Sequence, residues 1–158
     1  MLKFSLFSSS LTIGENAPEF SLKDQSGKIR RLSDYKGKKL VIYFFPKAFT
    51  PGWTKQACGL RDNYNSFETN DISILGVSYD SQKKLKNFKK EYNLSFNLLS
   101  DNKKVMGNLY GVNSFYFFPQ RKTFLIDEKG VLLHIINSVK INDHAEDILK
   151  IFKNLGGT

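Results

Sequence analysis

Two apolar runs rich in β-branched and aromatic residues constrain the fold of this 158-residue chain more than any other feature. Residues 40–45 read Leu-Val-Ile-Tyr-Phe-Phe, and residues 72–78 read Ile-Ser-Ile-Leu-Gly-Val-Ser. A continuous run of this kind is typical of a strand that is buried on both faces. Between the runs, from Trp53 to Phe67, apolar residues recur at three- and four-residue spacings, which predicts a helix. A strand, a helix and a strand in this order predict a right-handed parallel crossover.

Shorter segments flank this unit on both sides. Residues 20–24 and residues 29–32 enclose a Gln-Ser-Gly-Lys turn, which predicts a β-hairpin. After the second run we expect helices that begin at Ser81, Asp101 and Asp143, a hairpin with strands at 123–127 and 131–136, and a buried face of the last helix made by Ile148, Leu149, Phe152 and Leu155. This order predicts an α/β fold with a mixed central sheet, helices on both faces and an antiparallel pair at its C-terminal end.

The length and composition favour one domain. The chain is 41% hydrophobic and 14% aromatic, which is enough apolar material for one continuous core. Its 158 residues are too few for two domains of ordinary size. Because serines interrupt the few apolar residues near the start, we expect residues 1–12 to be a flexible lead-in and residues 13–158 to form the domain. The same interruption argues against a signal peptide. No apolar run approaches the roughly 20 residues of a membrane-spanning helix, so we expect no membrane partner.

The formal net charge of +9 raises the question of nucleic-acid binding. Binding to a phosphate backbone needs clustered basic residues, whereas the lysines here are scattered in ones and twos. The arginines are Arg30, Arg31, Arg61 and Arg121. We therefore expect a solvated lysine-rich surface and no nucleic-acid partner. A nucleic-acid-binding role is the third alternative, and binding that vanishes above moderate salt would be charge attraction alone.

Cys58 is the only cysteine, so an internal disulfide is impossible and a reducing compartment is indicated. A structural zinc site needs four Cys or His ligands, and the chain adds only two distant histidines, His134 and His144. We therefore predict no metal and no cofactor. Both histidines are expected at the surface or at an edge of the sheet.

Residues 46–54 join the end of the first apolar run to the start of the helix that follows it. Open α/β sheets bind ligands at such junctions. The free N–H groups and the positive end of the helix dipole favour an anion there, and would lower the pKa of a thiol in the first turn. On these residues alone, a Pro-Gly turn before a helix is also a common structural device, and that interpretation stays open.

The same junction resembles the active-site segment of peroxiredoxins of the Q type, also called bacterioferritin comigratory proteins. The similar stretches are Tyr-Phe-Phe-Pro-Lys-Ala-Phe-Thr-Pro-Gly at 43–52 and Thr-Lys-Gln-Ala-Cys-Gly-Leu-Arg-Asp at 54–62, followed by 14–22, 32–38, 76–81, 98–101, 110–112 and 121–127. The resemblance implies a thioredoxin-like fold, with a central mixed β-sheet flanked by helices and an N-terminal β-hairpin extension. It also implies an antioxidant thiol peroxidase in cell redox homeostasis, which reduces hydrogen peroxide and organic hydroperoxides with thioredoxin as reductant.

The resemblance gives roles to five residues. The family's Pro-X3-Thr-X2-Cys motif matches Pro46 and Thr50, and its peroxide-attacking cysteine falls on Trp53. By this resemblance Pro46 shields the site, the Thr50 hydroxyl and the helix N–H groups hold the peroxide oxygens, and Arg121 stabilises the thiolate and the developing charge. Cys58 falls on the resolving cysteine, which closes a disulfide after the first cysteine becomes a sulfenic acid.

Trp53 interrupts that reaction at its first step, because an indole has no ionisable thiol and cannot form a sulfenic acid. Five residues advance a helix by about 500°, which places Cys58 roughly 140° round and about 7.5 Å along from position 53. We therefore expect Cys58 to be a partly buried, ordinary thiol that does not face Thr50 and Arg121. Slow one-cysteine turnover through Cys58, after local unwinding of the helix, is the alternative.

Two functions from different classes remain. In the first, the chain is a peroxidase of the family in which Trp53 is an altered residue, and the presence of the other four motif residues favours descent from an active enzyme. In the second, the chain is a binding or scaffold protein that uses a plugged site and the aromatic run at residues 115–118. That run would form an exposed apolar patch or would pack onto the helix, with Trp53 joining it. We expect a monomer or weak dimer in the cytoplasm, with an organelle or plastid stroma as the alternative location.

Overall fold

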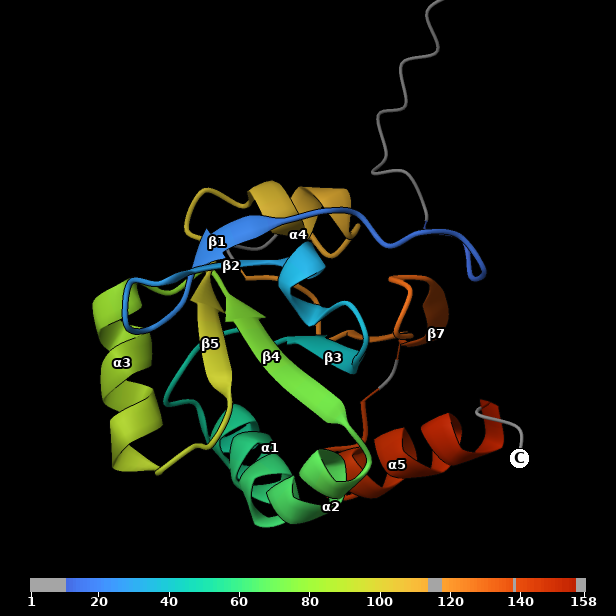
Figure 1. Ribbon diagram of the computed structural model, residues 1–158. Coiled ribbons are helices and arrows are strands. Elements are labelled where there is room, and N and C mark those ends of the chain that lie inside the picture. The colour runs from blue at the N-terminus through green and yellow to red at the C-terminus, as the bar shows by residue number, and fades with distance from the viewer. Residues whose placement is uncertain (1–10, 114–117, 138, 156–158) are drawn as a thin grey trace, which may run out of the picture.

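The computed structural model describes residues 11–113, 118–137 and 139–155. A five-stranded sheet with the order β5-β4-β3-β6-β7 forms its centre (Figure 1). The strands are β3 (Lys39–Phe44), β4 (Ile72–Ser78), β5 (Asn97–Ser100), β6 (Thr123–Ile126) and β7 (Leu132–Ile136). β4 runs parallel to both β3 and β5, whereas β6 runs antiparallel to both β3 and β7. The predicted mixed sheet with a C-terminal antiparallel pair is therefore confirmed.

Helices cover both faces of the sheet, as predicted. Figure 1 shows α1 (Pro51–Asp62), α2 (Tyr64–Thr69) and α5 (His144–Leu155) on one side, and α4 (Val105–Leu109) on the other. α3 (Gln82–Glu91) packs with the first group, and a short 3-10 helix spans Leu32–Tyr35. Because side chains alternate across a strand, Tyr43 of β3 joins the core on the α1 side, and its neighbours Ile42 and Phe44 join the core on the α4 side.

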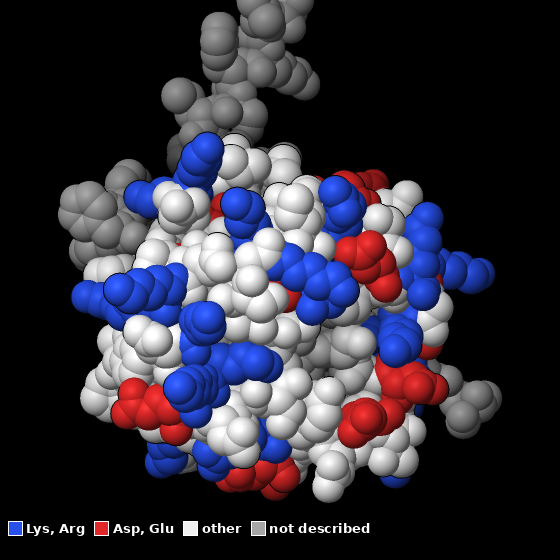
Figure 2. All heavy atoms as spheres, turned by 60° about the vertical axis from the view of Figure 1, so that its left-hand side comes forward, with Lys and Arg blue, Asp and Glu red and all other residues white. Residues whose placement is uncertain are grey.

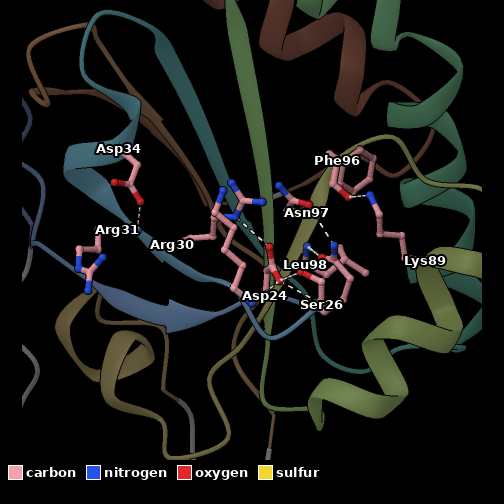
Figure 3. A network of polar contacts seen from close by, with 11 residues as sticks. Asp24, Ser26, Arg30, Arg31, Asp34, Lys89, Phe96, Asn97 and Leu98 are labelled. Atoms are coloured by element: carbon pink, nitrogen blue, oxygen red, sulfur yellow. Dashed lines mark hydrogen bonds and ion pairs between the residues drawn. The ribbon is translucent and has the colours of Figure 1, made fainter.

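A hairpin of β1 (Ser21–Lys23) and β2 (Ile29–Arg31) lies against the edge strand β5, as Figure 3 shows. Buried Asp24 accepts hydrogen bonds from the Ser26 hydroxyl (2.6 Å) and from Arg30 Nε (2.8 Å). Burial raises the pKa of Asp24, but the hydrogen bonds from Ser26, Arg30 and Lys28 outweigh it and keep the pKa below its usual value. Since the next residue, Gln25, accepts from the Leu98 amide (2.9 Å), the predicted hairpin covers an otherwise open edge of the sheet.

Four details of the elements differ from the predictions. The helix expected to begin at Asp101 is α4, which begins at Val105. β5 was not predicted, because its four residues, Asn-Leu-Leu-Ser, are too few to show the periodicity of a strand. The helix expected from Trp53 to Phe67 breaks at Asn63, whose side chain donates to the Gly59 carbonyl (2.8 Å) and competes with the backbone ladder. The prediction that Leu155 is buried was wrong, because it ends α5 and is 49% exposed.

The start of the described chain is attached to the sheet. Leu11 packs against the core on the α4 side, and the Gly14 amide donates to the Leu132 carbonyl (2.8 Å). The boundary between residues 12 and 13 remains a prediction, and residues 1–10 lie outside the described part. Among the helices of the described ranges, none is long and apolar enough to cross a membrane.

Candidate active site

The predicted site lies where β3 ends and α1 begins. Phe45 still bonds to β4, through its amide and the Val77 carbonyl (3.0 Å), and the chain then leaves the sheet. Thr50 is the residue before α1 and has extended backbone angles, and Pro51 occupies the first helical position, where its fixed φ suits a helix and no N–H is needed. The junction therefore has the strand-to-helix geometry that the sequence predicts.

Asp80, which the sequence analysis did not single out, holds this junction in place. Its Oδ2 accepts hydrogen bonds from the Ala48 amide (2.8 Å) and the Ser78 hydroxyl (2.9 Å), and Lys84 Nζ lies 3.3 Å from its Oδ1. The contact with Ala48 anchors a loop in which Phe49 adopts a left-handed conformation (φ 66°) that a bulky residue disfavours. The position of Asp80 shortly after β4 could have indicated this role, because the parallel strands β3 and β4 end at the same edge of the sheet.

The N-terminus of α1 is open. The Thr50 hydroxyl donates to the Lys47 carbonyl (2.8 Å) and does not cap the helix. The first amide to bond back along the chain is that of Thr54, which donates to the Thr50 carbonyl (2.9 Å). Among the described residues, the amides of Gly52 and Trp53 therefore have no backbone acceptor, and they add to the positive end of the helix dipole.

Arg121 brings its guanidinium to this helix end. Tyr43 pairs with Thr123, so Arg121, two residues before Thr123, lies beside the segment that follows β3. A Cβ atom at Gly52 would lie 3.1 Å from Nη2 and 3.5 Å from Nη1 of Arg121, so the absence of a side chain at Gly52 permits this close approach. Nη1 is buried and has no hydrogen-bond partner within the described ranges. A cation and free amides at one helix end favour a negatively charged or strongly accepting group.

Trp53 points into the core on the α1 side. Its side chain is fully buried, and its ring stacks on Phe45 with centroids 3.8 Å apart and planes at 4°. Its centroid also lies 4.7 Å from that of Tyr43 and 5.9 Å from that of Phe88. The indole Nε1 is buried without a partner in the part of the chain that the structure describes. Trp53 is therefore a core residue.

The other predicted site residues lie around the same helix. Pro46 is half-buried after β3, and Cys58 is a free, half-buried thiol five residues beyond Trp53 on α1. Of the aromatic run, residues 114–117 fall outside the described part, and Phe118 is 42% exposed. The structure thus brings Arg121 to the helix end that Thr50 begins, with Cys58 further along that helix.

The expectation that His144 lies at the surface or an edge was wrong. His144 is 2% exposed, with Nδ1 at 2.9 Å from Gln56 Nε2 and Nε2 at 2.8 Å from Thr123 Oγ1. Burial lowers the pKa of His144 to about 4, so the ring is neutral at neutral pH. The available signal was its spacing of four and eight residues from Ile148 and Phe152, which were both predicted to be buried.

Comparisons with known proteins decide the family. Residues 13–135 match the model of the AhpC/TSA family. The chain belongs to this family. It is 41% identical over 152 residues to Peroxiredoxin Bcp of Bacillus subtilis (strain 168), covering 92% of this chain and 97% of the relative. It is 42% identical over 145 residues to the chloroplastic Peroxiredoxin Q of Triticum aestivum, covering 90% and 67%.

Solved structures agree with this assignment. The crystal structure of Peroxidoxin BcpB from Mycobacterium tuberculosis matches with a TM-score of 0.84 and 31% identity, covering 91% of this chain and 97% of that one. The predicted resemblance to Q-type peroxiredoxins and the thioredoxin-like fold are therefore confirmed, and the family's activity is that of a peroxidase. The roles of individual residues, including the match of Trp53 to the family's cysteine, remain predictions. Among the described residues, no group of three His, Cys, Asp or Glu side chains is placed to hold a metal ion.

Proposed function

We propose that this chain is a thioredoxin-dependent peroxiredoxin whose peroxide site is retained and is blocked at one residue, Trp53. With a thiol at position 53, the substrates of this site are hydrogen peroxide and organic hydroperoxides. The observation that supports this proposal is the contact between Arg121 and Gly52 at the open end of α1. Among the described residues, Arg121 Nη1 is buried without a hydrogen-bond partner and lies next to amides without a backbone acceptor, an arrangement suited to stabilise negative charge on a reacting oxygen.

In the proposed reaction, a cysteine thiolate at position 53 attacks one peroxide oxygen. The S–O bond forms as the O–O bond breaks, the sulfur loses two electrons, and the leaving oxygen takes up a proton and departs as water or an alcohol. Arg121 and the amides of the first turn stabilise the leaving oxygen. The Thr50 hydroxyl donates to the Lys47 carbonyl, so its oxygen is left to accept a hydrogen bond from the peroxide. Pro46 shields the site from water.

The Cys58 thiol completes the proposed cycle. It attacks the sulfenic sulfur, which releases water and forms a disulfide, and the dithiol of thioredoxin reduces this disulfide by exchange. Trp53 supplies no sulfur, so the chain as written stops before the first step. Turnover through Cys58 alone would require α1 to unwind, because the helix holds Cys58 five residues away from position 53.

The test is thioredoxin-coupled peroxide consumption by the chain as written, by Trp53→Cys, and by Trp53→Cys combined with Cys58→Ser. We expect Trp53→Cys to exceed the chain as written by roughly 10³-fold or more, since nucleophile loss has effects of this size or larger. The double variant should consume about one equivalent of peroxide per chain when thioredoxin is the only reductant. Trp53→Ser is the matched control, because it shortens the side chain as much and adds no thiol.

Two outcomes contradict the proposal. If the chain as written already consumes peroxide at the rate of Trp53→Cys, the site does not depend on a thiol at position 53. If Trp53→Cys is folded, by its circular dichroism spectrum, and remains inactive, the peroxide site is not retained.

The second outcome supports a second candidate function, a binding or scaffold protein. This candidate is favoured by the packing of Trp53, which fills a core position without exposed surface and leaves Phe49 and Phe118 as exposed rings, at 39% and 42%. For either function we propose a monomer or weak dimer with a single domain over residues 13–158. We propose a reducing cytoplasm as its location, where Cys58 stays a thiol, with a plastid or other organelle stroma as the alternative.

A further inference from the structure

His144 joins three separate elements through its two ring nitrogens. It is the first residue of α5, and its ring lies between Gln56 of α1 and Thr123 of β6, at 2.9 Å and 2.8 Å. All three side chains are buried, at 2% exposure or less. Gln56 Nε2 donates to Nδ1, so the neutral ring carries its proton on Nε2 and donates it to the Thr123 hydroxyl oxygen.

The segments that lead into β6 and α5 also meet α1, about one turn nearer its N-terminus than Gln56. Gly52 lies one turn before Gln56 on α1, and Arg121, two residues before Thr123, lies next to Gly52. The segment that leads into α5 also contributes, because Ile141 Cδ1 would lie 3.2 Å from a Cβ at Gly52. The junction therefore has two groups of contacts. His144 with Gln56 and Thr123 forms the buried group, and Arg121 with Gly52 forms the group nearer the N-terminus of α1.

We propose that His144 is a positioning residue that holds Arg121 at the N-terminus of α1 and thereby sets the ionisation of a thiol at position 53. This inference rests on the proposed function in one respect, which is that position 53 is the place of the reacting thiol. Nη1 of Arg121 is buried without a hydrogen-bond partner among the described residues, so the place of the guanidinium depends on the backbone spacing between α1 and β6. The hydrogen bonds of His144 fix this spacing.

The buried state of His144 supports this role. Burial keeps the pKa of His144 at about 4, and the ring therefore stays neutral over the range in which a thiol is titrated. The Tyr43 ring lies 6.0 Å from the His144 ring between centroids, and it also lies 4.7 Å from the Trp53 ring. The charged groups at the start of α5, Asp143, Glu146 and Asp147, are exposed or half-buried.

The test uses a chain with one thiol at the reacting position, made by Trp53→Cys with Cys58→Ser. The pKa of that thiol is measured from the pH dependence of its alkylation by iodoacetamide, without peroxide or thioredoxin. Adding His144→Phe, which keeps a ring and removes both hydrogen bonds, should raise the thiol pKa by about 1, a tenfold loss of thiolate at a fixed pH below it. His144→Asn, which can keep the bond to Gln56, should give a smaller rise.

Two further variants make the result specific. Arg121→Gln should raise the thiol pKa by itself, and His144→Phe should then add little, because both changes remove the same interaction. His134→Phe is the matched control, since His134 lies on β7 outside this junction, and it should leave the thiol pKa unchanged. If His144→Phe does not fold, Thr123→Val breaks one of the same bonds and should shift the pKa in the same direction.

The outcomes separate this inference from the proposed function. A thiol pKa that is unchanged by His144→Phe, or shifts from His144→Phe and Arg121→Gln that simply add, would overturn the positioning role. If Arg121→Gln itself leaves the thiol pKa unchanged, Arg121 does not act on position 53, and both this inference and the role of Arg121 in the proposed function fail. If Arg121→Gln raises the thiol pKa and His144→Phe does not, only this inference fails. Because the readout needs no turnover, loss of peroxidase activity does not affect it.

Discussion

Trp53 has two roles. Its ring is part of the core, and in the proposed function it occupies the position of the reacting thiol. The indole stacks on Phe45 and packs near Tyr43 and Phe88, so a smaller side chain removes one ring contact from each of these three residues. The indole N–H is buried without a partner among the described residues, which offsets part of the gain from packing, by about 1–3 kcal/mol. Stability therefore favours a large aromatic side chain at position 53, whereas the proposed reaction needs a thiol there.

Trp53→Cys, which should restore chemistry, is expected to lower the free energy of unfolding by about 2 kcal/mol. Truncating a buried tryptophan costs about 3–5 kcal/mol, and removing the unpaired N–H returns part of this. Urea denaturation followed by circular dichroism measures the change. The matched control is Trp53→Phe, which keeps a ring on Phe45 and removes the N–H, and should cost less. A Trp53→Cys variant at least as stable as the chain as written would show that the stacking contributes no net stability.

At the scale of elements, the sequence is most informative where one physical pattern dominates. The continuity and length of the two apolar runs predict β3 and β4. The hydroxyl of Ser81 caps α3 as expected, accepting from the Lys84 amide at 3.2 Å. The site loop was found through its position and its motif. Local patterns indicate that Asp80 follows β4 and that His144 lies on the buried face of α5. They do not reveal the hydrogen-bond partners of these residues, which lie 32 and 88 residues away, and both were therefore missed as site residues.

The loop before α1 is expected to depend on Asp80 more than on any contact of its own. Asp80→Ala removes the acceptor of the Ala48 amide and should lower the free energy of unfolding by about 1–3 kcal/mol. It should also speed hydrogen exchange at the Ala48 amide in the native state. Asp127→Ala is the control, because Asp127 holds the turn before β7 through the Lys129 and Val131 amides. Equal exchange at Ala48 in both variants would contradict the anchoring role.

At the scale of the whole molecule, the positive charge is spread over the surface. Figure 2, which turns the α3 side forward, shows Lys and Arg side chains over the whole face with Asp and Glu between them. α3 itself carries Lys83, Lys84, Lys86, Lys89 and Lys90. Two of these are engaged within the fold, because Lys84 pairs with Asp80 and Lys89 donates to the Phe96 carbonyl at 2.8 Å. On this face the remaining lysines are interspersed with acidic side chains, a distribution that favours weak attraction of a polyanion over a dedicated binding site.

We therefore expect duplex DNA to bind weakly, without sequence preference, with a dissociation constant of about 10⁻⁶ M or higher at physiological salt, and to be lost as salt rises. Fluorescence anisotropy of a labelled duplex between roughly 50 and 200 mM salt measures this. The pair Lys86→Glu with Lys90→Glu on α3 should weaken binding no more than Lys150→Glu with Lys153→Glu on α5, since all four lysines are exposed. Binding that persists at the higher salt, and that only the α3 pair abolishes, would instead indicate a nucleic-acid site on α3.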